Sequence, residues 1–166
     1  DTEGRVLTIF TLSKTYSMTG WRVGWTVASE EIITAMTVCQ EPVVSCINTV
    51  AQHAAIAALE GPQDCVVEMV ADYRRRRDVA VETAKKLGLD FYYPHGAFYL
   101  LINIRESDLT SVPFSESLLQ TEHVAVAPGA GFGSMCDDYV RISLCAAEED
   151  VIKGIERIAR HMDRAV

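Results

Sequence analysis

The sequence lacks several features that mark common classes of protein. No apolar run among its 166 residues reaches the roughly 18–20 residues that a membrane-spanning helix needs, which argues against a membrane protein. Residues 1–5 are polar and include two acids, so no signal peptide is evident. The net charge of −8 and the pI near 4.9 argue against a nucleic-acid partner, because nucleic-acid binding favours a basic surface.

Cysteine and histidine are present, but in no pattern that indicates a disulfide framework or a metal site. The five cysteines are an odd number and include no C-x-x-C pair, which indicates reduced, mostly buried thiols in a cytoplasmic protein. The four histidines lie far apart and have no metal-ligand spacing, so no metal is expected.

The pattern of apolar residues and breakers indicates that strands and helices alternate. Short apolar runs predict strands at residues 6–10, 23–28, 97–104, 124–127 and 139–145. Helices are predicted from Ser29 to Pro42 and over residues 48–59, 63–87, 114–122 and 147–162. The class is therefore α/β or α+β, with a domain boundary near residue 61, where Gly61-Pro62 breaks the pattern. The strand at 6–10 is predicted to be buried, and because the chain starts just ahead of it we expect a fragment.

Only four lysines are present, and Lys14 differs from the other three. It lies in a loop directly after a predicted strand, whereas the others lie among charged residues on predicted helices. Thr11 precedes it by three residues, Arg22 follows it by eight, and Gly20 allows a sharp turn between them. An amine, a hydroxyl and a guanidinium on one turn suit pyridoxal phosphate (PLP), because its aldehyde needs a lysine and its phosphate favours an arginine fork.

The segment S-K-T-Y-S-M-T-G-W-R-V-G at 13–24 resembles the PLP-lysine signature of class I aminotransferases, a fold-type-I family that includes aspartate aminotransferases. Similarity to this family continues at P-H-G-A-F-Y (94–99), P-G-A-G-F-G (128–133) and Y-V-R-I-S-L (139–144). The resemblance implies a fold-type-I PLP transferase. Residues 1–60 would then close the large PLP-binding domain and residues 61–166 would form the small α+β C-terminal domain.

The same resemblance implies a role for individual residues. Lys14 would form the Schiff base with PLP and move the substrate proton. Arg22 would bind the PLP phosphate, assisted by Thr11, where the family more often has serine. Ser45 would reach the cofactor phosphate of the partner subunit, since family members are homodimers with sites at the subunit interface. Arg141 would bind the α-carboxylate of the substrate.

Arg141 is also unusual on physical grounds. It interrupts the apolar strand pattern at 139–144, and a charge within such a strand needs a partner or a functional reason. Taken alone, the pattern fits a buried ion pair as well as it fits a carboxylate-binding site.

The expected activity is PLP-dependent transamination between an L-amino acid and a 2-oxo acid, a step of amino-acid metabolism. Two alternatives remain: another fold-type-I PLP enzyme, such as a carbon–sulfur lyase or a cyclopropane-forming synthase, and a non-catalytic dimerisation module. The family's other cofactor contacts lie upstream of the lysine and are not in this sequence. The 166 residues by themselves are therefore expected to be inactive and poorly soluble.

Overall fold

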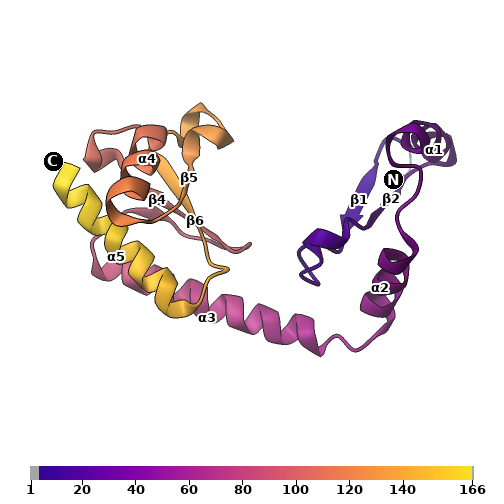
Figure 1. Ribbon diagram of the computed structural model, residues 1–166, viewed down its shortest axis with the longest axis horizontal. Coiled ribbons are helices and arrows are strands. Elements are labelled where there is room, and N and C mark those ends of the chain that lie inside the picture. Colours follow the sequence, from indigo (N-terminus) through magenta and orange to yellow (C-terminus); the bar gives the residue numbers. More distant parts are fainter. Residues whose placement is uncertain (1–3, 166) are drawn as a thin grey trace. The chain divides into compact units, whose positions relative to one another are not determined.

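The computed structural model describes residues 4–165, which divide into two compact units between Met69 and Val70 (Figure 1). The division falls within the longest helix, α3 (Asp64–Lys86), which follows the break at Gly61-Pro62. Each unit is defined by the contacts within it, and this division does not test where the domains of the protein begin and end. The domain boundary predicted near residue 61 therefore stays a prediction.

The first unit contains a two-stranded antiparallel sheet and two helices. Strands β1 (Thr8–Thr11) and β2 (Gly24–Val27) pair along their whole length, so that Thr11 faces Gly24. A turn containing the 3-10 helix η1 (Thr19–Trp21) joins them. A small core lies beside this turn, made of Leu12, Met18, Val23 and Ala51.

The prediction that the first strand is buried is wrong within this unit. All four residues of β1 are exposed, and the side chain of Ile9 is 72% exposed. Among the described residues β1 pairs only with β2, and a two-stranded ribbon cannot cover both of its own faces. Phe10 and Trp25 partly shield one another by stacking, with ring centroids 5.2 Å apart.

Two helices complete the first unit. Helix α1 (Glu30–Val44) continues through Pro42, so the prediction that proline ends it is wrong; it ends at Ser45, whose N–H bonds to the Glu41 carbonyl. Helix α2 (Thr49–Glu60) begins where expected, because the Asn48 side chain accepts the Ala51 N–H at 2.8 Å and caps the first turn.

The second unit is a four-stranded antiparallel sheet with helices packed on one face (Figure 1). The strands occur in the order β3 (Phe91–Tyr92), β4 (Tyr99–Asn103), β6 (Tyr139–Ser143) and β5 (Ala127–Pro128). The C-terminal part of α3, α4 (Ser111–Glu122) and α5 (Glu148–Ala165) supply the helical layer. The alternation of strands and helices predicted from the sequence is confirmed, although the two-residue strand β3 was not predicted.

Side chains alternate between the two faces of this sheet. Leu100, Ile102, Val140 and Ile142 point into the core against the helices and are buried. Arg141 lies between two of them in sequence, so it projects from the opposite, half-exposed face. The short helices η2 (Arg105–Ser107), η3 (Gly129–Phe132) and η4 (Ser134–Cys136) form the loops around the sheet.

The cysteines do not behave as the sequence suggested. All five are free, but four are exposed and Cys136 is half-buried, so the prediction of mostly buried thiols is wrong. They lie in surface turns and on the outer faces of helices, where local sequence gives little indication of burial. None of the helices within residues 4–165 combines the length and the apolar character needed to cross a membrane.

Candidate functional site

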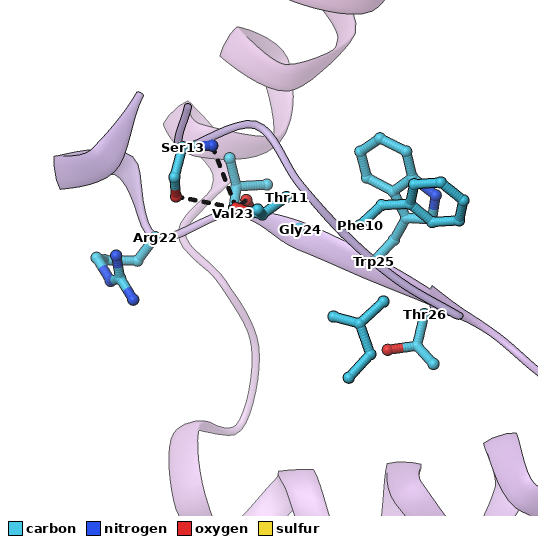
Figure 2. Close-up of a pocket in the computed structure, with 9 residues that line it drawn as sticks. Phe10, Thr11, Ser13, Arg22, Val23, Gly24, Trp25 and Thr26 are labelled. Atoms are coloured by element: carbon cyan, nitrogen blue, oxygen red, sulfur yellow. Dashed lines mark hydrogen bonds between the residues drawn. The ribbon is translucent and has the colours of Figure 1, made fainter. Parts of the chain in front are cut away.

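A pocket with both polar and apolar walls lies where the first strand turns towards the second (Figure 2). Its volume is about 280 Å³, and three of the residues that line it could bind an anion: Thr11, Ser13 and Arg22. The remaining walls come from both strands, and they include the stacked rings of Phe10 and Trp25. The pocket belongs entirely to the first unit, so its geometry does not depend on the second.

Thr11 and Ser13 form a hydrogen-bonded pair in this pocket (Figure 2). The backbone N–H of Ser13 donates to the Thr11 hydroxyl oxygen at 3.1 Å, and the Thr11 hydroxyl donates to the Ser13 hydroxyl oxygen at 2.9 Å. Because Ser13 accepts in this second bond, its own hydroxyl hydrogen stays available to a ligand. Thr11 is exposed and Ser13 is half-buried.

Arg22 reaches the pocket from the other end of the turn. Its backbone is left-handed, with φ of 54°, and its Nη1 donates to the carbonyl oxygen of Thr19 at 2.9 Å. Within residues 4–165 no carboxylate forms an ion pair with Arg22, which leaves most of its five N–H donors for a ligand. Gly24 then lets β1 and β2 close together, since a Cβ there would lie 2.4 Å from the Phe10 carbonyl oxygen.

Lys14 directly follows Ser13 on the same turn and is exposed. Its carbonyl oxygen accepts the N–H of Ser17 at 3.3 Å, which helps to fold the turn back. Its side chain is not among those that line the pocket. The structure thus brings Thr11, Ser13 and Arg22 together and places Lys14 beside them along the chain.

The second unit contains the other candidate, Arg141. It lines a cavity of about 470 Å³ on the open face of the sheet. Its guanidinium carbon lies 4.1 Å from the ring centroid of Tyr99 and 4.4 Å from that of Phe132. No carboxylate in the described part of the chain pairs with it, so the alternative of a buried structural ion pair fails within these residues.

Ser45 stands apart from the pocket of the first unit. It is exposed at the end of α1, with φ of 63°, and does not contribute to the lining of that pocket. Its predicted role concerns the cofactor of a partner subunit, so it stays a prediction. No cluster of three or more potential metal ligands occurs within residues 4–165.

Sequence reasoning missed Ser13. The residue stands inside the quoted signature, directly before the lysine, and the spacing of Thr11, Lys14 and Arg22 does not single out its hydroxyl. The sequence does contain a signal for Ser13: its hydroxyl comes two residues after that of Thr11, which places both hydroxyls on one short turn.

The chain is similar to known aminotransferases over most of its length. The family model for aminotransferase class I and II matches residues 1–158. The chain belongs to this family. An aspartate aminotransferase of Thermotoga maritima is 41% identical over 154 residues, which cover 93% of this chain and 39% of the relative. An LL-diaminopimelate aminotransferase of Dehalococcoides mccartyi is 37% identical over 93% of this chain and 39% of its own length.

Solved aminotransferase structures have the same fold. The crystal structure of an aromatic aminotransferase from Pyrococcus horikoshii matches 98% of this chain and 44% of its own, with a TM-score of 0.92 and 38% identity. The expected class, mixed helix and sheet of the fold-type-I aminotransferases, is confirmed. The chain spans about two-fifths of the length of these relatives. Members of the family generally depend on PLP.

Proposed function

We propose that this chain is part of a PLP-dependent aminotransferase that moves an amino group between an L-amino acid and a 2-oxo acid. The observation that carries the proposal is the pocket of Thr11, Ser13 and Arg22, with Lys14 beside it on the same turn. The aminotransferase names of the relatives support the same reaction class.

The pocket suits the phosphate of PLP by the chemistry of its donors. The Ser13 hydroxyl and the Arg22 guanidinium supply hydrogen bonds and a permanent positive charge, which match a phosphate dianion. The Thr11–Ser13 hydrogen bond leaves one hydroxyl hydrogen to donate, so a ligand need not break that pair in order to bind. In this proposal Arg22 is the main phosphate ligand, Ser13 is an additional donor, and Thr11 assists by holding the Ser13 hydroxyl in place.

Lys14 would attach the cofactor and move the proton. When bound, PLP supplies an electron sink for the charge that develops at the substrate α-carbon. The Lys14 amine would take the proton from that α-carbon. Arg141 would bind the α-carboxylate through its in-plane N–H groups. The complete enzyme would be a homodimer, with Ser45 near the cofactor phosphate of the second subunit.

The proposed activity is tested with the complete polypeptide in which this chain occurs. Incubated with PLP, an L-amino acid and a 2-oxo acid, it should form a new amino acid and a new 2-oxo acid in equal amounts. A carbon–sulfur lyase or a cyclopropane-forming synthase would instead consume its amino acid without any added 2-oxo acid. Either that outcome, or no reaction with any pair across a broad substrate panel, would refute transamination.

The proposed phosphate ligands lead to a separate prediction. Arg22→Gln removes the permanent charge, so the Kd for PLP should rise by roughly 10- to 100-fold, whereas Ser13→Ala should raise it about 3- to 10-fold. Equilibrium dialysis with absorbance of bound cofactor measures both. The control is Thr15→Ala, which lies on the same turn outside the pocket and should leave the Kd unchanged. Unchanged affinity in both pocket variants would remove the phosphate assignment.

A further inference from the structure

The guanidinium of Arg141 lies close to two aromatic rings that come from opposite neighbours of its strand. Strand β6 lies between β4 and β5 in the sheet. Tyr99 belongs to β4, and Phe132 belongs to η3, which directly follows β5. Their ring centroids lie 4.1 Å and 4.4 Å from the guanidinium carbon, within the range of a strong cation–π contact.

The two rings that contact the guanidinium come from two different elements, β4 and η3. Both lie within 4.4 Å of the same carbon, yet in the described part of the chain they make no ring–ring contact with one another. In the register Arg141 pairs with Leu101 of β4 and with Ala127 of β5, and Tyr99 lies two residues from Leu101 on the same face of the sheet. Contacts with two rings restrain a planar guanidinium, whose edge carries the N–H groups that bind a carboxylate in a bidentate manner.

The ring of Tyr99 is itself packed against another aromatic ring. Phe98 packs against it at 4.5 Å, and the ring of Tyr73 on α3 packs against Phe98 at 5.5 Å. The Tyr73 hydroxyl donates to the sulfur of Cys145 at 3.4 Å, and this hydrogen bond, together with burial, raises the pKa of Tyr73. A tyrosine with a raised pKa stays neutral at physiological pH, so this support adds no charge next to the site.

We propose that Tyr99 and Phe132 are positioning residues that clamp the guanidinium of Arg141 and direct its edge towards a substrate carboxylate. The clamp rests on the carboxylate-binding role proposed for Arg141. In this proposal the two rings act through Arg141 and not on the reacting atoms. Their contribution is to hold a flexible side chain in one orientation before the ligand arrives, which lowers the entropic cost of binding.

The clamp is tested by ring removal in the complete polypeptide. Tyr99→Leu and Phe132→Leu should each weaken binding of 3-phenylpropanoate, a carboxylate without an amino group, by about 3- to 10-fold in isothermal titration. In turnover assays the same variants should raise KM with little change in kcat. Tyr99→Phe keeps the ring and should restore binding. Tyr139→Leu changes an aromatic on the strand of Arg141 that, in the described part of the chain, forms no cation–π contact with it, and it should have no effect.

A double-mutant cycle separates positioning from general structural damage. In an Arg141→Lys background the planar guanidinium is gone, so further removal of either ring should weaken carboxylate binding by less than about twofold. Equal losses in both backgrounds, or full affinity in the single ring variants, would overturn the clamp. The proposed function is judged separately: absence of transamination by the wild-type protein would refute it, while direct carboxylate binding still decides the clamp.

Discussion

Replacement of Lys14 by arginine should abolish transamination, lowering the rate of the half-reaction by roughly 10⁴-fold or more. A guanidinium keeps the positive charge but is never deprotonated in proteins, so it can neither attach the cofactor nor accept the substrate proton. Single-turnover measurements with an amino acid, which follow the absorbance of the bound cofactor, isolate this step from product release.

The matched control is Lys153→Arg, on the exposed surface of α5, where the side chain pairs with Glu149. It should keep full activity, because a surface ion pair of this kind contributes little to stability and arginine can form the same pair. If Lys14→Arg retained a rate within about tenfold of the wild type, the lysine would not perform the proton transfer proposed for it.

Gly129→Ala should destabilise the second unit by about 3 kcal/mol or more. Gly129 is buried, and a Cβ there would lie 1.8 Å from the Cys136 carbonyl oxygen and 2.4 Å from that of Tyr139. Both obstacles are backbone atoms, so no side-chain rotation relieves the clash. Urea unfolding followed by far-UV circular dichroism measures the change in the free energy of unfolding.

Gly131→Ala is the matched control on the same 3-10 turn. Nothing lies within 4 Å of the added Cβ, so the free energy of unfolding should change by less than about 0.5 kcal/mol. Because Phe132 lies on η3 together with Gly129, the Gly129 variant should also weaken carboxylate binding. Equal free energies of unfolding for the two alanine variants would contradict the prediction, because η3 would then be able to move and make room for the added Cβ.

Features set by local sequence were predictable. Asn48 caps α2, Gly61-Pro62 separates two helices, and Gly88 follows α3 with φ of +72°, as its place after a long helix suggests. Each depends on the conformational preference of one or two residues, which the sequence shows directly. Pro42 is the exception: it lies in the last turn of α1, where the helix continues for two more residues after it.

Burial was harder to predict, because it depends on distant neighbours. The apolar strand near the start of the chain was expected in a core, yet Ile9 is 72% exposed since no described layer covers β1. Arg141 was treated as part of an apolar strand, although the strand period of two places it opposite Val140 and Ile142. That alternation was visible in the sequence and could have excluded a fully buried charge.

The candidate site was predictable in part. The spacing of Thr11 and Arg22 suggested that both serve one anion, and both line the same pocket, joined there by Ser13. The contacts of Arg141 could not be deduced, because Tyr99 and Phe132 meet it only through the register of β4 with β6 and the path of the turn after β5. Such contacts depend on sheet topology, which local patterns do not determine.

The most direct test of the account is to locate the bond between protein and cofactor. The complete polypeptide should be mixed with PLP, reduced with borohydride, digested and analysed by mass spectrometry. The account predicts that the peptide containing Lys14 gains the mass of reduced PLP. Label on another lysine instead, or no label on a protein that binds PLP, would contradict it.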